Sequence, residues 1–352
     1  MYMISVPSVC RHGIQIETIY KNRKEFRRFI MVVPVLLFIA GFILLIKGGD
    51  WFVDGATGIA EHFHLPELLI GATVVSIGTT LPEVMVSCQA ALKGSGGISY
   101  GNAIGSVICN TSLIAAITVA VKPSLVKRKS LILPSGFFFT AAIIYAAIAY
   151  TTGRFERWQG ILLLACFVTY MCVLLLQMKK NPEESAADSS EQIKERPMFQ
   201  NVIMLVIGAA AIAVGANLLV NNGTLIAQAL GVPDSVIGLT MVALGTSLPE
   251  LVTAITALSK GHGALSRGNV IGANLFNIVL VSGLAITIAP FGIPAERTIA
   301  GINSSLAVDI PVMFIVMGIL CIPALLKEKL SRWQGVTLLA IYVGFTIYQF
   351  VA

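Results

Sequence analysis

Ten long apolar runs occupy most of this 352-residue chain. A helix needs about 20 mainly apolar residues to cross the hydrocarbon core of a bilayer. The chain is 56% hydrophobic and 12% charged, whereas a soluble domain carries about 25% charged residues. The runs therefore predict an all-α polytopic membrane protein with ten transmembrane helices. They cover residues 30–60, 67–92, 98–121, 131–151, 158–178, 198–229, 235–259, 265–290, 305–326 and 333–351.

Two polar stretches divide the chain. Residues 179–197 separate the fifth run from the sixth, and their acidic side chains lack the spacing of an EF-hand, which favours a solvated linker over a calcium sensor. Residues 1–30 form a basic extension without the apolar segment of a signal peptide. Because Met31 opens the first run, one hypothesis is that translation begins there. The helical units are then expected at 31–178 and 198–352.

These two units are copies of each other. Shifted by 167 positions, residues 71–110 align without a gap with residues 238–277 and are identical at 18 of 40 positions. Five spans in each unit is an odd number, so the second copy must enter the membrane in the opposite direction. An inverted repeat whose helices are interrupted by Gly and Pro at matching positions is typical of secondary transporters, which bind their substrate near the bilayer midplane.

The loop charges predict an orientation. Loops after odd-numbered spans carry thirteen Lys and Arg residues, and loops after even-numbered spans carry four. Because cytoplasmic loops are enriched in Lys and Arg, we expect the 179–197 linker in the cytoplasm and both termini outside. The basic residues before Met31 instead favour an N-terminus in the cytoplasm. The net charge of +6 thus reflects membrane topology, and we expect neither a nucleic-acid partner nor an obligate protein partner.

Each copy places a glutamate inside an apolar run. The first copy has Ser76, Thr79, Thr80 and Glu83. Their i, i+3, i+4, i+7 spacing places all four on one face of a helix. At the same positions the second copy has Ala243, Thr246, Ser247 and Glu250. A charged side chain at the bilayer centre costs about 2.5–3.5 kcal/mol on insertion scales and indicates a functional site by default. Two such glutamates at mirrored depth predict a shared site.

A proline precedes each glutamate. Pro82 and Pro249 lack an N–H, so the carbonyls of Gly78 and Gly245, four residues earlier, are expected to lose their helical donors. Irregular backbone at membrane depth is tolerated only where it is buried in protein or lines an aqueous cavity. We therefore expect the freed carbonyls to act as cation ligands.

Asparagines line the next run of each copy. Asn102, Ser106 and Asn110 share one face of the third run, and the eighth run has Asn269, Ala273 and Asn277. Of the four amides, those of Asn110 and Asn277 are predicted to be ligands. Asn102 and Asn269 follow a Gly near the start of a run, which favours helix caps.

All of these candidate ligands are hard oxygen donors, without His, Cys or Met. Such a set suits Ca²⁺ or Na⁺ and excludes a soft transition-metal centre. Two carboxylates balance one Ca²⁺ or two Na⁺, so one site can hold either load but not both, as antiport requires. A proteolytic dyad of two intramembrane acids is disfavoured because no further nucleophile or base accompanies Glu83 and Glu250. We therefore expect no enzyme and no cofactor; a calcium channel remains a less favoured alternative.

The motifs resemble a known family. Gly78–Glu83 and Gly245–Glu250 each read G-T-[ST]-L-P-E and are each followed by G-N-x-I-G-[SA]. They resemble the two alpha-repeats of the cation/calcium antiporter family, in its prokaryotic sodium/calcium exchanger branch, and the resemblance extends over the chain from about Met31 onward. It implies ten helices in a prokaryotic cell membrane, with first and sixth helices that slide over the rest, and Na⁺/Ca²⁺ exchange by alternating access.

The resemblance also implies roles for individual residues. Glu83 and Glu250 correspond to the carboxylates shared by both ions. The sodium ligands implied are Thr79, Ser106, Thr246 and the carbonyl of Ala243. Thr80 and Ser247 add hydroxyls, and the carbonyls of Thr79 and Thr246 resemble the backbone donors to calcium.

Two positions depart from the family pattern. Ala273 stands where the family commonly has Ser, and Asn277 stands where some members have Asp. Both departures weaken the sodium assignment more than the calcium assignment. Because a buried pair of glutamates can also take up protons, H⁺/Ca²⁺ exchange is the alternative function.

Overall fold

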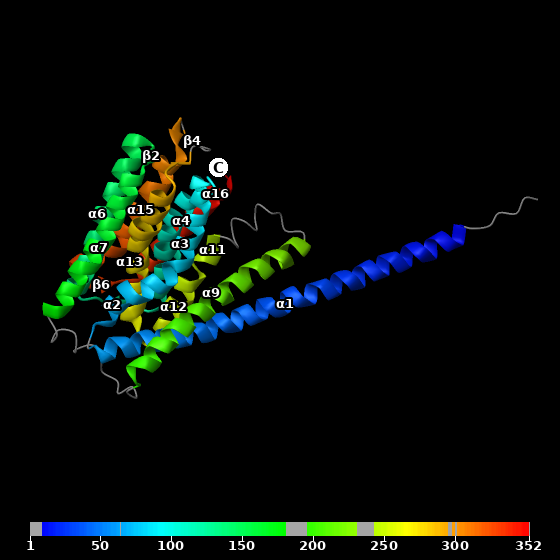
Figure 1. The fold of residues 1–352 in the computed structure, drawn as a ribbon, viewed down its shortest axis with the longest axis horizontal. Coiled ribbons are helices and arrows are strands. Elements are labelled where there is room, and N and C mark those ends of the chain that lie inside the picture. The colour runs from blue at the N-terminus through cyan, green and yellow to red at the C-terminus, as the bar shows by residue number, and fades with distance from the viewer. Residues whose placement is uncertain are drawn as a thin grey trace, which may run out of the picture.

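A computed structural model describes residues 9–63, 65–180, 196–230, 243–294, 298–299 and 301–351. These residues form a helical bundle, and two long helices, α1 and α9, run together across one side of it (Figure 1). The described part of the chain contains almost no sheet: of three pairs of two-residue strands, two join separate loops at the ends of the bundle, and the third, β4–β5, lies within one loop.

The first repeat begins with the longest helix. α1 is Val9–His62, and it runs through Met31 without a break. The elements that follow are α2 (Glu67–Ile70), the π-helix η1 (Gly71–Val75), α3 (Ser76–Leu92), α4 (Gly96–Cys109), the π-helix η2 (Asn110–Ala115), α5 (Ala116–Val121), β1 (Ser124–Leu125), α6 (Arg128–Thr152), β2 (Arg154–Phe155) and α7 (Arg157–Lys180).

The second repeat begins with α9, Met198–Ala229. The elements that follow are α11 (Ala243–Thr246), α12 (Leu248–Ser259), α13 (Gly263–Phe276), the π-helix η5 (Asn277–Val281), α14 (Ser282–Ile288), β3 (Phe291–Gly292), β4 (Thr298–Ile299), β5 (Ile302–Asn303), the π-helix η6 (Ser305–Asp309), α15 (Ile310–Lys327), β6 (Lys329–Leu330) and α16 (Arg332–Val351).

Eight helical spans among the described residues are long and apolar enough to cross a membrane. The predicted runs 67–92 and 198–229 agree with two of them to the residue. The seventh predicted run lies partly on residues 231–242, outside the described residues, and its described part contains α12, an apolar helix of 12 residues. The tenth run is the 20-residue α16, which is not among the eight.

Four of the spans are not purely α-helical, which the sequence analysis did not anticipate. The second, third, eighth and ninth runs contain the π-helical segments η1, η2, η5 and η6. A π-helix pairs each N–H with the carbonyl five residues earlier, and such segments are frequent at functional sites. They shift the register of the residues that follow relative to a continuous α-helix.

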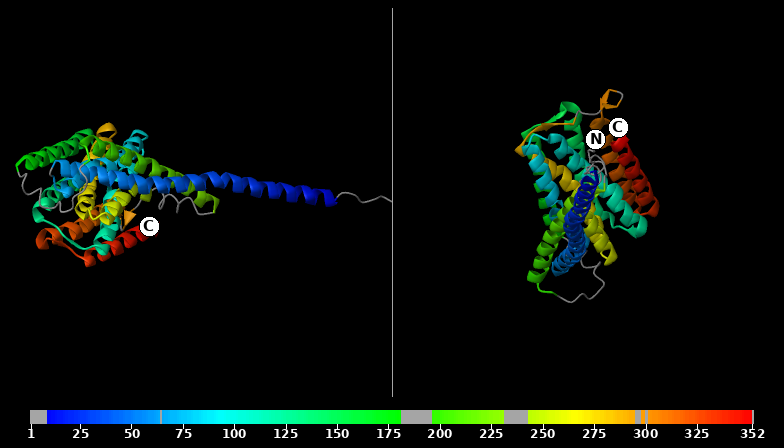
Figure 2. Two further views of the ribbon diagram at one scale, coloured as in Figure 1. Left: turned by 90° about the horizontal axis from the view of Figure 1, so that it is seen from below. Right: turned by 90° about the vertical axis from the view of Figure 1, so that its right-hand side faces the viewer.

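Small residues hold α1 against α9. A Cβ added to Gly208 would lie 2.4 Å from the backbone nitrogen of Phe52, and one added to Gly41 would lie 2.8 Å from the carbonyl oxygen of Gly215. Such contacts let two membrane helices approach at the level of their backbones. This pair has the most extensive contact between described elements, and Figure 2 shows the two helices side by side.

Strand pairs tie the loops together at opposite ends of the bundle. β1, in the loop after α5, pairs antiparallel with β6, in the loop after α15. β2, in the loop after α6, pairs with β3, in the loop after α14. Figure 1 shows β6 and α2 at one end, and β2 and β4 at the other.

The α1–α9 contact predicts a large effect of substitution at Gly208. Gly208→Leu places a side chain against the backbone of Phe52, and overpacking of this kind costs about 1–3 kcal/mol. We expect a lower Tm of the purified protein in detergent. Gly136→Leu on α6 is the control, because no atom lies within 4 Å of a Cβ there. Equal Tm values for the two variants would contradict this account of the packing.

Candidate functional site

Two glutamates are fully buried inside the bundle. Glu83 lies within α3 and Glu250 lies in the first turn of α12, and each is 0% exposed. The two carboxyl groups interact electrostatically with each other. None of their four carboxyl oxygens makes a hydrogen bond of normal geometry with the described residues, although the Thr79 hydroxyl of the first repeat interacts with the Glu250 carboxyl group. Because a buried charge without a partner is strongly destabilising, these groups require a cation or protons.

Other predicted ligands are buried in the same way. These residues are fully buried, and their side-chain polar atoms make no hydrogen bond of normal geometry with the described residues. They are Thr80, Asn110, Ser247 and Asn277. A buried polar atom without a partner costs about 1–3 kcal/mol, and such groups are uncommon in native proteins unless something else satisfies them. The donor chemistry, carboxylate, hydroxyl and amide oxygen, fits a hard cation such as Ca²⁺ or Na⁺.

The π-helices place the two asparagines. Asn110 is the first residue of η2, which packs against α12, and Asn277 is the first residue of η5, which packs against α3. Each amide therefore lies on an element that contacts the glutamate helix of the other repeat. The sequence contained the two asparagines but no local signal for the π-helical turns that begin at them.

Asn102 and Asn269 are not helix caps, contrary to the sequence analysis. The helices that contain them begin earlier, at Gly96 for α4 and at Gly263 for α13. The Asn102 amide nitrogen donates to the backbone oxygen of Glu83 (3.1 Å) and to the Ser87 hydroxyl (2.8 Å). It therefore braces the backbone at the glutamate.

Asn269 braces the same helix from the other side. Its side-chain oxygen accepts a hydrogen bond from the Thr79 hydroxyl (3.2 Å). The Ser76 hydroxyl lies 2.9 Å from the backbone oxygen of Asn269 and 2.7 Å from that of Gly71. The Thr79 hydroxyl thus donates to α13, whereas the single Ser76 hydroxyl proton has the Gly71 carbonyl of its own span as its nearest acceptor and the Asn269 carbonyl of α13 as the next. The oxygen lone pairs of both hydroxyls stay available to a cation.

The two prolines have different effects. Pro82 lies inside α3, which continues through it as a helix. Pro249 lies in the first turn of α12, where a missing N–H costs nothing, and Ser247 separates this helix from α11. The helix is therefore interrupted in the second repeat, just before Glu250, and continuous in the first, where Pro82 still has no N–H to donate to the carbonyl of Gly78.

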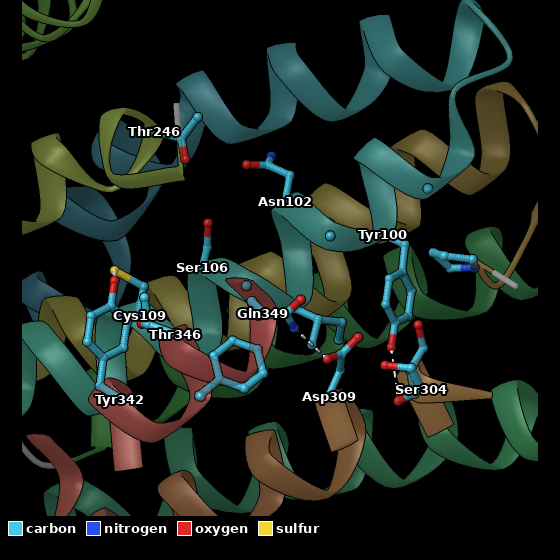
Figure 3. A pocket seen from close by; sticks show the side chains of 17 residues that line it. Tyr100, Asn102, Ser106, Cys109, Thr246, Ser304, Asp309, Tyr342, Thr346 and Gln349 are labelled. Carbon is cyan, nitrogen blue, oxygen red and sulfur yellow. Dashed lines mark hydrogen bonds between the residues drawn. The ribbon is translucent and has the colours of Figure 1, made fainter. Parts of the chain in front are cut away.

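A cavity of about 380 Å³ reaches part of the predicted site (Figure 3). Its lining extends from Pro294 and Ser304, in the segment after α14, to Ser106 and Thr246. The hydroxyls of Ser106 and Thr246 point into it. The cavity thus connects two predicted sodium ligands with the end of the bundle that carries β2 and β4.

The repeats differ around this site. Ser106 on α4 has a hydroxyl, whereas its counterpart Ala273 on α13 is a fully buried methyl group. Ala243, the counterpart of Ser76, begins α11, and only its backbone carbonyl could bind a cation. The second repeat adds Thr253, buried without a described partner one turn after Glu250. The sequence analysis missed Thr253 because the first repeat has Val86 at that position.

The comparisons with known proteins concern the chain as a whole. Residues 33–176 and 200–351 match the family described as "Sodium/calcium exchanger protein". The chain is 36% identical over 313 residues to the uncharacterized membrane protein MJ0091 of Methanocaldococcus jannaschii, covering 89% of this chain and 97% of that protein. It is 33% identical over 356 residues to the sodium/calcium exchanger MaX1 of Methanosarcina acetivorans, covering 91% and 99%.

A solved structure is also similar. The sodium-calcium exchanger NCX_Mj, soaked with 10 mM Na⁺ and 10 mM Sr²⁺, superposes with a TM-score of 0.72 at 33% sequence identity. The match covers 89% of this chain and 97% of that chain. Both the sequence and the arrangement of the helices are thus shared over nearly the full length of these relatives.

The partnerless carboxylates predict that calcium stabilises the folded protein. A ligand at 100 times its Kd adds about 2.7 kcal/mol to the free energy of unfolding, so saturating Ca²⁺ should raise Tm in detergent. Glu83→Gln and Glu250→Gln should each abolish the rise. Glu156→Gln, which removes an exposed carboxylate paired with Arg154, should preserve it. A full Ca²⁺ response in either of the first two variants would refute the site.

Proposed function

Because this chain belongs to the sodium/calcium exchanger family, we propose that it is a secondary active antiporter. It exchanges Na⁺ for Ca²⁺ by alternating access through one site that both ions share. The observation that carries the proposal is the pair of fully buried carboxylates, Glu83 and Glu250, which have no ion-pair partner in the described part of the chain.

The charge of the two carboxylates explains exchange. One Ca²⁺ or two Na⁺ neutralise them, whereas Ca²⁺ together with Na⁺ leaves an uncompensated positive charge in a low-dielectric interior. The two loads therefore exclude each other. The charge of the site can be buried only after Ca²⁺ or Na⁺ has bound. This requirement couples the Ca²⁺ flux to the Na⁺ flux.

We assign the ligands by position in the repeats. The carboxylates of Glu83 and Glu250 bind both ions. The other proposed ligands are Ser76, Thr79, Thr80, Ser106, Asn110, Ala243, Thr246, Ser247 and Asn277, with Ala243 contributing its backbone carbonyl. The cross-repeat packing of η2 on α12 and of η5 on α3 supports a single site formed by both copies.

Ten transmembrane helices in two inverted five-helix repeats are the proposed architecture. The loops after the third and eighth spans occupy equivalent places in the two repeats. β1, in the first of these loops, pairs with β6, whereas β3, in the second, pairs with β2, and the two strand pairs lie at opposite ends of the bundle. This arrangement supports opposite membrane orientations of the two copies.

The orientation follows from the loop charges. We propose that the end carrying β1 and β6 faces the cytoplasm, together with the 179–197 linker, and that the C-terminus lies outside. The cavity that reaches Ser106 and Thr246 then extends from the outer side. This structure therefore corresponds to a state that receives ions from outside.

Transport measurements test the exchange. Proteoliposomes loaded with Na⁺ should take up ⁴⁵Ca²⁺ when they are diluted into Na⁺-free buffer. Glu83→Gln and Glu250→Gln should lower this uptake at least about 100-fold, because removing one member of a buried charged set costs about 3–5 kcal/mol. Glu156→Gln is the control with an exposed carboxylate.

The same preparation distinguishes the alternatives. Uptake driven by a pH gradient without Na⁺ would replace the proposal by H⁺/Ca²⁺ exchange through the same carboxylates. Unitary currents in a planar bilayer would replace it by a calcium channel. Uptake at the wild-type rate in either glutamine variant would remove the central site.

The difference between the repeats predicts the effect of restoring a hydroxyl. Ala273→Ser introduces the group that Ser106 supplies in the first repeat, and one additional ligand should lower the Na⁺ concentration for half-maximal exchange about threefold or more. Ser106→Ala, the mirror-image variant, should raise it. The half-saturating Ca²⁺ concentration should change less than the Na⁺ value in both. An unchanged Na⁺ dependence in Ala273→Ser would contradict the assignment of this position.

A further inference from the structure

A second cavity lies at the end of the bundle opposite the ion pathway. It encloses about 690 Å³, within the range of about 300–1,000 Å³ that is usual for small-molecule sites. Four stretches of helix ends and the adjoining loops form its walls, namely 66–68, 122–130, 258–267 and 327–328. None of the proposed ion ligands lines it.

Hydrogen bonds hold these walls in place. The β1–β6 pair joins the loop after α5 to the loop after α15, and the backbone nitrogen of Val126 donates to the carbonyl oxygen of Glu328 at 2.9 Å. The Arg267 guanidinium, half-buried on α13, donates to the Ser124 hydroxyl at 2.7 Å. The cavity is therefore a built feature that three transmembrane segments share.

Its charge is positive. Four basic side chains line the cavity, Lys122, Lys127, Arg267 and Lys327. The two acidic side chains in the lining, Glu67 and Glu328, leave a formal excess of two positive charges. Glu67 pairs with the His262 imidazole at 2.6 Å, and Glu328 accepts a hydrogen bond from the backbone nitrogen of Arg128 at 3.0 Å. The Glu67 carboxylate raises the pKa of His262, so that the pair becomes more nearly neutral at low pH.

The cavity also lies at a defined depth. Lys122 directly follows one apolar span, Lys127 directly precedes another, and Lys327 is the last residue of a third. The spans that begin at Glu67 and Gly263 start at the same wall. Ends of transmembrane helices lie at the level of lipid headgroups, and the N-terminus of α6 adds a positive dipole end there.

We propose that this cavity binds the phosphate-bearing headgroup of an anionic phospholipid. Basic pockets between transmembrane helices are the recognised chemistry for such headgroups. Lys122 and Lys327 line the cavity with exposed side chains, and their ammonium groups attract the negatively charged phosphate. The half-buried Arg267 supplies a planar donor fixed by Ser124, which suits the geometry of a phosphate group.

Native mass spectrometry of the full chain in detergent tests the proposal. Titrated with phosphatidylglycerol, the wild-type protein should retain this lipid in preference to phosphatidylcholine, which carries the same phosphate but no net charge. Lys122→Gln/Lys327→Gln should weaken retention about 30-fold, since each lysine near a phosphate contributes about fivefold. Lys122→Arg/Lys327→Arg should restore it.

A matched control removes the same charge from the same face. Lys129→Gln/Lys329→Gln alters two lysines that do not line the cavity and should leave retention unchanged. Equal losses in both glutamine pairs would reveal unspecific attraction and overturn the proposal, as would wild-type retention in Lys122→Gln/Lys327→Gln. Complete displacement of the lipid by inorganic phosphate would also overturn it, because the ligand would then be a soluble anion.

Discussion

The structure depends on the burial of two carboxylates that face no cationic side chain. Taking one carboxylate out of water costs several kcal/mol even after relaxation, and no ion pair recorded in the described part of the chain involves Glu83 or Glu250. The compensating charge must therefore come from bound cations or from protons. This requirement makes the site selective for the total charge of its load, which is the physical basis of the proposed exchange between one divalent and two monovalent cations.

The surrounding helices hold the site without supplying charge. Amides of Asn102 and Asn269 bond to α3 from two neighbouring helices, and so fix the backbone and hydroxyls on either side of Glu83. Outside this core, α1 and α9 pack on each other through glycines. Their mutual contact is the most extensive between described elements.

Much of this arrangement could be predicted from the sequence, because it rests on patterns that repeat. The paired motifs ending in Glu83 and Glu250 identified both acids, and the bounds of the spans at 67–92 and 198–229 followed from hydropathy. Features that depend on contacts between distant helices could not be predicted. Asn269 bonds to a hydroxyl 190 positions away, so its position near the start of a run suggested a cap instead. The π-helices at Asn110 and Asn277 reflect the packing register between repeats and have no local signature.

Competition between the two ions at equilibrium tests the central claim most directly. Calcium binding to the purified protein should be measured by calorimetry at increasing Na⁺ concentrations, with choline maintaining the ionic strength. Mutual exclusion at one site predicts that the apparent Kd for Ca²⁺ rises without limit as Na⁺ increases, while the number of Ca²⁺ ions bound at saturation stays constant. A plateau in the apparent Kd at high Na⁺ would show that both ions occupy the protein together and would contradict the shared site.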